Sequence, residues 1–413
     1  MGNPIEVVIT GMGAICGAGV GVAALRAAAD EGRSGVTTIT EFDTTNLPVK
    51  IAGSARAFDP ASVLDAKQVR LAARVVQLAV GAAVEATGTE VAGALGDVMR
   101  FGTMVGTSTG GIEVIADGME TLAVKGPRRV SPFAVPQLMD NAAAAWIALR
   151  WGFRGPAYSV STACSTSMDA IGIASDMIRS GRLDACLAGG AEGAVIPYMM
   201  AEFARSNMLS KRNDDPATAS RPFDKDRDGF VMGEGAGLLL LERRDRAEKR
   251  GAKILARVAG YGAAMDANPD MISPRPDGRS LTGAMEQALN QAGISTTDIG
   301  YISAHGMSAQ TEDVSEAASI RTVFGAYADK IPVGATKSVT GYTLAASGAL
   351  STIAAILAVR DGWLFPNQTF KTPDPDCRLN ILAGKPGHAT VKYAMANALG
   401  FGGHGSCLIL AAP

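Results

Sequence analysis

The 413-residue sequence lacks the features that mark a disulfide scaffold, a nucleic-acid-binding protein or a membrane protein. Its five cysteines are far apart and form no CxxC pair, which argues against a disulfide framework and against a metal site such as zinc. Lys plus Arg number 38 and Asp plus Glu 40, so no global charge attracts nucleic acid or an acidic membrane. Purely aliphatic runs are far below membrane-spanning length, and the N-terminus has no basic stretch followed by an apolar one. These absences favour a soluble, cytoplasmic enzyme.

Short apolar runs that end at or near glycine recur along the chain, with helix-like stretches between them. Runs that are continuously apolar, instead of alternating with polar residues, are typical of strands covered on both faces. Strands that alternate with helices predict βα layers, so the fold class is α/β. Expected strands are residues 7–11, 101–106, 185–190, 237–241, 254–258, 301–304 and 407–410, and expected helices are residues 66–87, 167–180, 280–292 and 348–359.

A weak internal echo and a charged segment bear on how the chain is divided. Residues 104–110 resemble residues 333–341, because each is an expected strand that runs into a turn of Ser, Thr and Gly. From this alone, duplication and chance are equally open. The charged segment 242–253 is a candidate junction between halves, although one solvated helix explains it equally well. We place the two halves at residues 1–253 and 254–413.

Cys164 lies in a small-residue turn between an expected strand and a helix that begins with Ser and Thr. A thiol at this place faces the unpaired N–H groups and the positive dipole end of the helix, which stabilise a thiolate and lower the thiol pKa. Cys164 is therefore a candidate nucleophile. The alternative, a small buried hydrophobe, is equally open from position alone. For the other four cysteines we expect that structural role.

Motifs in one order along essentially the whole chain resemble the elongating β-ketoacyl-acyl-carrier-protein synthases. The resemblance implies the thiolase-like fold, a five-layered α-β-α-β-α sandwich of two similar halves, and a homodimer. It also supports the internal repeat and a role in fatty-acid or polyketide biosynthesis. The motifs that carry it are residues 126–136, 155–156, 162–165, 188–192, 221–224, 227–236, 304–306, 336–338 and 400–403.

The family uses a Cys-His-His triad for decarboxylative condensation, and the resemblance assigns roles to several residues here. Cys164 matches the nucleophile that takes the acyl chain. His305 matches the first histidine, whose neutral imidazole donates to the malonyl thioester and promotes loss of CO2. As a lone residue it could equally be a loop histidine with a satisfied hydrogen bond. Phe401 matches the residue that gates the acyl pocket, and its backbone N–H and that of Cys164 match the oxyanion hole.

The second triad histidine is absent, because this chain has Tyr342 where the family has histidine. His388 and His404, the remaining histidines, do not match the triad. A phenol still donates one hydrogen bond, but with a pKa of about 10 it cannot share a proton near neutral pH. Loss of one donor of this kind costs about 10²–10³ in rate, so condensation would be slowed or redirected.

Other departures lie around the same pocket. Lys337 matches the family lysine that organises the site, but the carboxylate with which it usually pairs aligns with Ser351. Met307 and Ala309 stand where the family has two threonines that contact the pantetheine arm. The carboxylates on the following turn could pair with Lys337 instead, namely Glu312, Asp313 and Glu316.

A basic helix face is a candidate docking site for the acidic acyl carrier protein. Lys67, Arg70 and Arg74 fall at helical spacing within residues 66–87, and Arg70 matches a basic position of the family. Arg128 and Arg129 could extend the patch. A local patch on a nearly neutral protein suits an acidic partner, although an ordinary solvated face is as good a reading. The resemblance implies no cofactor in the chain itself, because phosphopantetheine arrives on the carrier.

The leading hypothesis is an acyl-carrier-protein-dependent ketosynthase that is acylated on Cys164 and condenses the acyl group with malonyl thioester. Two alternatives stay open. One is a catalytically weakened, chain-length-factor-like partner subunit in a heterodimer with a complete synthase. The other is an acyltransferase that keeps the acyl-enzyme but uses a non-malonyl acceptor. Retention of Cys164 argues against the partner subunit, whereas the substitutions around the pocket favour it.

Overall fold

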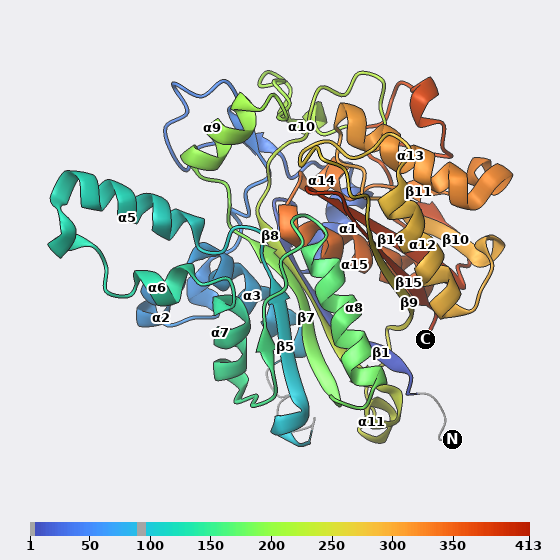
Figure 1. Ribbon diagram of the computed structural model, residues 1–413, viewed down its shortest axis with the longest axis horizontal. Helices are drawn as coiled ribbons and strands as arrows, with labels where there is room; N and C mark the ends of the chain where they lie inside the picture. The colour runs from blue at the N-terminus through green and yellow to red at the C-terminus, as the bar shows by residue number, and fades with distance from the viewer. Residues whose placement is uncertain (1–4, 89–95) are drawn as a thin grey trace.

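The computed structural model describes residues 5–88 and 96–413, in which a large mixed sheet runs through the molecule (Figure 1). The first four residues of the predicted N-terminal half lie outside this range. Within it, the main sheet has the strand order β11-β10-β14-β15-β9-β1-β8-β7-β5-β6, with β2 paired to β1. Its two parts meet where β1 pairs with β9 through only two residue pairs, Val8 with Arg257 and Ile9 with Ala256.

Each half of the sheet repeats one topology. If the five strands of each half are numbered in chain order, the third strand pairs with the second and the second with the fourth. The fourth then pairs with the fifth, and the fifth with the first. The first two of these pairings are parallel and the other two antiparallel in both halves. The N-terminal strands are β1 (Val7–Cys16), β5 (Phe101–Gly106), β6 (Ala157–Tyr158), β7 (Ala185–Glu192) and β8 (Gly235–Arg243), and the C-terminal ones are β9 (Ala256–Met265), β10 (Ile299–Ser303), β11 (Val333–Gly334), β14 (Tyr393–Gly400) and β15 (His404–Ala411).

Helices cover both faces of each half-sheet and produce five layers (Figure 1). Helices α3 (Arg74–Thr87) and α7 (Ala142–Trp151) cover the outer face of the N-terminal half. Helices α12 (Arg279–Ala292) and α13 (Gln310–Phe324) form the outer layer of the C-terminal half. The middle layer contains α8 (Thr166–Arg179) and α15 (Ser347–Asp361), which pack against each other. Because α15 is covered by both sheets, every residue from 347 to 359 is buried.

Most of the remaining elements are short. The helices are α1 (Val22–Asp30), α2 (Ala66–Leu71), α5 (Ile112–Lys125), α6 (Ala134–Leu138), α9 (Pro197–Arg205), α10 (Pro216–Ala219), α11 (Arg244–Lys249) and α14 (Lys337–Thr340). Single 3-10 turns are Pro60–Ser62, Val98–Arg100, Pro127–Arg129, Thr296–Asp298, Gly325–Asp329, Leu344–Ala346 and Pro375–Cys377. Further strands are β2 (Gly19–Val20), β3 (Thr37–Thr38), β4 (Ile51–Ala52), β12 (Trp363–Leu364) and β13 (Gly387–His388).

The segments that are equivalent in the repeated topology are not the segments that resemble each other in sequence. Residues 104–106 belong to β5, whose counterpart in the second half is β10, whereas residues 333–334 form β11, whose counterpart is β6. The sequence echo therefore pairs strands that are not equivalent. By topology, the segment after β11 is the counterpart of the turn after β6, which carries Cys164. The two halves consequently present these two segments to each other.

Several expected elements have different bounds. The expected helix 66–87 is two helices, because Ala72 has extended backbone between α2 and α3. The expected strand 254–258 begins at Ala256 and runs to Met265. Within the charged segment 242–253 only Arg244–Lys249 is helical, and the proposed division at residue 253 falls in the connection from α11 to β9.

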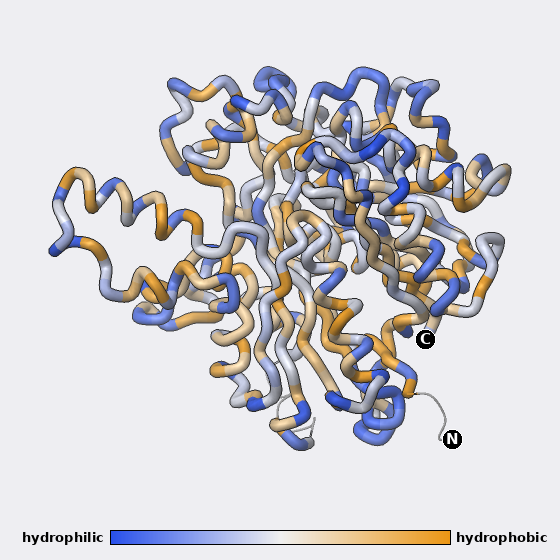
Figure 2. The backbone as a smooth tube through the Cα atoms, in the orientation of Figure 1, coloured by the Kyte–Doolittle hydropathy of each residue, from blue (hydrophilic) through white to orange (hydrophobic). Residues whose placement is uncertain are grey.

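Helix α5 projects from the body as an arm, seen at the left of Figure 1. None of its residues is buried. Apolar side chains nevertheless lie along it, as the orange segments of Figure 2 show, and Met119 is 64% exposed and Val124 74% exposed. An exposed apolar surface of this kind is typical of a contact with another protein.

Among the described residues, one helical stretch, Leu344–Asp361, is long and apolar enough to cross a membrane, and 89% of it is buried inside the protein. This stretch includes α15, the central helix that both half-sheets cover. Its apolar character therefore fits its place in the core of the sandwich.

The middle layer should carry much of the folding free energy. Replacing Ile353 of α15 by alanine removes a side chain that is completely buried, and we expect a loss of about 2–5 kcal/mol of unfolding free energy. The matched change Ile173→Ala on α8 affects a residue that is 37% exposed and should cost less than about 1 kcal/mol. Urea unfolding measures both. Equal losses would contradict this placement of the core.

Candidate active site

The turn that carries Cys164 has a constrained backbone. Ala163 has a φ of 51°, a left-handed conformation that costs free energy for a residue with a Cβ. Its carbonyl accepts hydrogen bonds from Thr166 Oγ1 at 2.6 Å and from Ser108 Oγ at 3.0 Å, and these hold the turn. Cys164 is only 4% exposed and lies in an apolar cluster. The expected strand, turn and helix are present, although the strand β6 is two residues long.

The C-terminal half brings three side chains to this turn. His305 follows β10, whereas Lys337 and Tyr342 follow β11. Lys337 Nζ lies 3.5 Å from His305 Nδ1 and also donates to the His305 carbonyl. Tyr342 Oη lies 3.4 Å from His305 Nε2, and the Tyr342 hydroxyl is close enough to the Cys164 sulfur for each group to shift the pKa of the other. All four side chains are buried, so the structure places the predicted residues together.

The contacts give this line of side chains a direction. A protonated Lys337 can only donate, so His305 Nδ1 is the acceptor and Nε2 carries the imidazole proton. Nε2–H then points to the Tyr342 oxygen, which leaves the Tyr342 O–H as a donor for the nearby Cys164 sulfur. A donor beside the sulfur favours the thiolate and the neutral phenol. Tyr342 therefore acts to lower the pKa of Cys164, whereas burial first and then the neighbouring sulfur raise the pKa of Tyr342.

Burial dominates the pKa of the nucleophile. Desolvation raises the pKa of Cys164 to about 11, and the nearby carboxylate of Glu192 adds to the rise. Tyr342, Lys337 and the Phe401 N–H act in the opposite direction but do not cancel it. The expectation of a lowered pKa at the helix N-terminus is therefore wrong in this buried site, because loss of water outweighs the local donors. Cys164 is a thiol here at neutral pH.

Burial also keeps the imidazole neutral. The pKa of His305 lies well below its ordinary value, first because the ring is buried and second because Lys337 is positively charged. The pKa of Lys337 falls to about 8 through burial, and Glu316 limits that fall. At pH 7 the ammonium is therefore mostly charged and the imidazole uncharged. This is the protonation state that the resemblance requires for a hydrogen-bond donor.

Among the carboxylates considered for Lys337, Glu316 exerts the largest electrostatic effect. Its two oxygens accept the backbone N–H groups of His305 at 2.8 Å and Gly306 at 2.7 Å, so it also holds the histidine loop. Asp313 instead faces Arg227, with 3.7 Å between the charged atoms. The Ser351 hydroxyl lies 3.4 Å from the Thr336 hydroxyl. Glu316 therefore provides the carboxylate near Lys337, because Ser351 has none.

Apolar side chains surround the reacting groups. Met307 and Ala309 are 2% and 6% exposed and share the apolar cluster of Cys164 and Tyr342. Their contact with a pantetheine arm stays a prediction. Phe401 is half-buried, with its ring centroid 6.3 Å from that of Phe203, and its N–H interacts with the Cys164 sulfur. The groups expected to form the oxyanion hole therefore lie at the sulfur.

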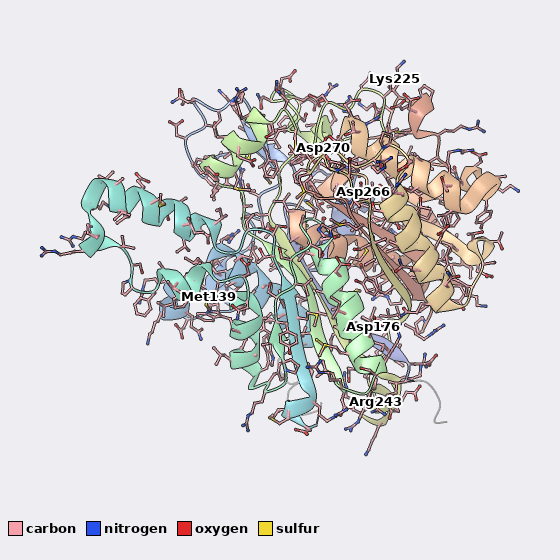
Figure 3. All side chains as sticks on the ribbon, in the orientation of Figure 1. Met139, Asp176, Lys225, Arg243, Asp266 and Asp270 are labelled. Carbon is pink, nitrogen blue, oxygen red and sulfur yellow. The ribbon has the colours of Figure 1, made fainter. Side chains whose placement is uncertain are left out.

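A surface loop holds the segment that contains Phe401. Asp266, labelled in Figure 3, donates its N–H to the carbonyl of Gly403 at 3.0 Å. The Gly402 N–H donates to the Met271 carbonyl at 2.8 Å. His404 begins β15 just beyond this segment, and His388 lies in β13, so neither replaces the second triad histidine. A shift of the backbone at Gly402 and Gly403, next to Phe401, would have to break these contacts.

The predicted basic face is smaller than expected. Lys67 and Arg70 are exposed on α2. Arg74 begins α3 after the break and pairs with Glu234 at 2.7 Å, so it does not extend the face. Arg128 and Arg129 are exposed in the 3-10 turn beyond α5. Among the residues that the structure describes, no cluster of three or more His, Cys, Asp or Glu side chains is arranged to hold a metal ion.

Comparisons with known proteins agree with this site and fold. The family model described as "Beta-ketoacyl synthase, N-terminal domain" matches residues 5–247, and "Beta-ketoacyl synthase, C-terminal domain" matches residues 255–371. The 3-oxoacyl-[acyl-carrier-protein] synthase 2 of Vibrio cholerae is 40% identical over 98% of both chains. The protein of the same name from Coxiella burnetii is 39% identical over 98% of both chains.

Solved structures show the same similarity. The ishigamide ketosynthase/chain length factor matches with a TM-score of 0.91 and 33% identity over all of both chains. A type II polyketide ketosynthase, in a complex with its acyl-carrier protein, matches with a TM-score of 0.88 and 31% identity over all of both chains. Two repeated halves with a buried cysteine and histidine at their junction define a condensing enzyme of the thiolase-like fold. This chain belongs to the β-ketoacyl synthase family, which confirms the predicted family and fold.

The pH dependence of thiol alkylation tests the environment of Cys164. With a pKa of about 11, the thiolate fraction increases about tenfold for each pH unit between 7 and 10, and the alkylation rate should follow it. Iodoacetamide labelling after brief exposure to each pH, read from the mass of the Cys164 peptide, measures this. A rate that levels off near pH 8 would show a lowered pKa and contradict the burial effect.

Proposed function

We propose that this protein is a ketosynthase that condenses thioesters bound to an acyl carrier protein in fatty-acid or polyketide assembly. The observation that carries the proposal is the buried meeting of the Cys164 sulfur, the Tyr342 hydroxyl and the His305 imidazole. A nucleophile and neutral hydrogen-bond donors are what acyl transfer and enolate formation require. Full-length similarity to proteins named 3-oxoacyl-[acyl-carrier-protein] synthase 2 supports the same activity.

In the first step, the Cys164 sulfur attacks the carbonyl carbon of the acyl thioester. The negative charge that develops on the carbonyl oxygen is stabilised by the N–H groups of Cys164 and Phe401. The carbon–sulfur bond to the carrier then breaks, and the carrier leaves as a thiol that takes the proton from Cys164. Because burial raises the thiol pKa, binding of the thioester must provide the stabilisation that the empty site lacks.

In the second step, a malonyl thioester loses CO2, and the bonding electrons form an enolate. His305 Nε2–H and the Tyr342 O–H donate to its oxygen. Once Cys164 carries an acyl group, its sulfur is a poorer acceptor, so the Tyr342 hydroxyl is free to turn to the enolate. The enolate carbon attacks the acyl carbonyl and the bond to the Cys164 sulfur breaks, which releases the 3-oxoacyl product on the carrier. The sulfur leaves as a thiolate and takes a proton from solvent, which restores the thiol.

Replacement of the nucleophile tests acyl transfer. Cys164→Ala should gain no acyl mass when incubated with an acyl-loaded carrier, whereas the wild-type protein should gain one acyl group. Cys16→Ala is the matched control, because Cys16 is also a buried free thiol but lies in the β1 strand, away from the site. Intact-protein mass spectrometry reads the result. An acylated Cys164→Ala protein, or an unmodified wild type, rejects the assignment.

Replacement of Tyr342 separates the two steps. Tyr342→Phe removes the hydroxyl but keeps the ring that packs edge-to-face on Phe230 and His305. Loss of an enolate donor should reduce CO2 release from malonyl carrier by about 10²–10³-fold. Acylation of Cys164 should fall much less. Radiolabelled CO2 and intact mass measure the two steps in one preparation, and equal losses in both would assign Tyr342 to acyl transfer instead.

The second candidate function is a partner subunit in a heterodimer, in which a complete synthase performs the condensation. Helix α5 carries exposed apolar side chains and none of its residues is buried, which favours association with another protein. A second copy of this chain in that place would give the expected homodimer. Similarity to a ketosynthase/chain length factor keeps the heterodimer as the alternative. A subunit that only shapes a neighbour's pocket would not become acylated.

An acyl-enzyme that never releases CO2 from malonyl carrier would instead indicate a non-malonyl acceptor.

We place the carrier on the exposed face that contains Lys67 and Arg70, with the pantetheine arm passing Met307 and Ala309. The phosphopantetheine group belongs to the carrier, so the proposed reaction needs no cofactor held by this chain. Such carriers are acidic, and complementary charge increases the rate of encounter. The proposed location is the cytoplasm, where the carrier substrates would be present.

Charge reversal tests this docking face. The double change Lys67→Glu and Arg70→Glu should increase KM for acyl carrier severalfold and weaken its dependence on salt. Turnover of a small thioester that lacks the carrier should stay unchanged, because both residues are exposed and outside the buried site. Arg378→Glu, at a residue whose side chain is 71% exposed on the other half, is the control. An unchanged KM for the carrier in the double variant would exclude this face.

A further inference from the structure

A buried carboxylate, Asp169, lies on α8 close to the nucleophile turn and has no part in the steps above. It is 4% exposed, and each of its oxygens accepts hydrogen bonds from two hydroxyl groups. Thr162 Oγ1 and Ser165 Oγ donate to Oδ2 at 2.5 and 3.1 Å. Tyr261 Oη and Ser406 Oγ donate to Oδ1 at 2.9 and 2.5 Å. Four hydroxyl donors thus satisfy one buried negative charge.

The two pairs of donors come from different halves of the molecule. Thr162 and Ser165 lie on either side of Cys164 in the turn. Tyr261 lies in β9 and Ser406 in β15, two paired strands of the C-terminal half. Helix α8, on which Figure 3 labels Asp176, contacts both strands. The carboxylate therefore joins the nucleophile turn to the sheet of the half that carries His305.

The turn has little freedom on its other side. A Cβ at Gly400 would lie 2.6 Å from the Thr162 carbonyl oxygen and 3.2 Å from the Cys164 nitrogen, so the segment before Phe401 packs directly on it. Ser165 Oγ also donates to the Thr162 carbonyl at 2.8 Å. A shift of Thr162 would therefore move the Cys164 N–H relative to the Phe401 N–H, the two groups expected to form the oxyanion hole.

We infer that Asp169 is a positioning residue for acyl transfer: it holds Thr162 and Ser165 so that the sulfur and N–H of Cys164 face one thioester together with groups from the other half. The inference rests on the proposed function, because it concerns acylation of Cys164. Burial, and then the neighbouring Asp169 carboxylate, raise the pKa of the Tyr261 phenol, so Tyr261 keeps the proton with which it donates to Asp169. A misplacement of about 1 Å in an active site costs about 10²-fold in rate.

Acyl transfer and alkylation should respond differently to the loss of this carboxylate. Acyl transfer needs the sulfur and the oxyanion donors in one geometry, whereas alkylation by iodoacetamide at a fixed pH needs only an accessible sulfur with an unchanged thiolate fraction. Asp169→Ala should therefore reduce acylation of Cys164 about 10²-fold and alter its alkylation less than threefold. Asp169→Asn keeps two accepting lone pairs and should cause a smaller loss. A purely structural role would lower thermal stability. In the folded variant, the rates of acylation and alkylation would then both match those of the wild-type protein.

The experiment measures both rates well below the melting temperature, after circular dichroism shows each variant to be folded. The matched control is Glu242→Gln, at another buried carboxylate, 1% exposed, which accepts hydrogen bonds from Arg250 and lies outside the site. This control should lose stability but keep the acyl-transfer rate. If Asp169→Ala does not fold, Tyr261→Phe and Ser406→Ala each remove one donor from the opposite half and should each slow acyl transfer.

The outcomes separate this inference from the proposed function. A wild-type protein that is never acylated rejects the proposed function itself. A wild-type protein that is acylated, with a folded Asp169→Ala variant within twofold of it, overturns the role of Asp169 alone. Equal losses of acylation and alkylation also overturn it. Adding Tyr261→Phe to Asp169→Ala should have no further effect, because both act through the same carboxylate, and additive losses would contradict that connection.

Discussion

The site depends on a line of hydrogen bonds that crosses from one half of the protein to the other. It runs from Lys337 through His305 to Tyr342, whose hydroxyl is close enough to the sulfur of Cys164 to shift its pKa. The repeated topology makes this possible, because the turn after β6 and the segment after β11 are equivalent places in the two halves. Each half alone holds either the nucleophile or the donors. The active site therefore exists only where the two halves pack together.

Burial determines how this line works. It raises the pKa of Cys164 to about 11, lowers that of Lys337 to about 8 and keeps His305 uncharged. A thiol pKa two units above its usual value costs about 3 kcal/mol when the thiolate forms. This cost is what remains after the Tyr342 hydroxyl, Lys337 and the Phe401 N–H have offset part of the effect of burial. A site with few charges and several neutral donors suits a reaction in which the negative charge appears on the substrate.

The sequence predicts the strands and helices that a local pattern of residues is enough to identify. The apolar runs at β5 and β7 and the helices α8, α12 and α15 lie within two residues of their expected starts. The break between α2 and α3 was not predicted, because Ala72 and Ala73 contain no helix-breaking signal. The arm α5 and the strand β14 also lacked a clear pattern.

The site shows the same difference between what a local motif identifies and what only the folded chain determines. Motif matches predict Cys164, His305, Lys337 and Tyr342, and the structure brings them together. The direction of the Cys164 pKa could not be read from the helix N-terminus, because it depends on water excluded by distant segments. Asp169 could not be found either, since its donors come from a turn, β9 and β15. Only the folded chain shows four hydroxyls around one carboxylate.

A single-turnover experiment shows whether the acyl group on Cys164 is condensed with malonyl carrier. Wild-type protein acylated on Cys164 is separated from free carrier and mixed with one equivalent of malonyl carrier, and CO2 and product are quantified together. The account predicts CO2 release in equal amount to the 3-oxoacyl carrier, with loss of the acyl mass from Cys164. A stable acyl-enzyme that releases no more CO2 than the Cys164→Ala protein would contradict it.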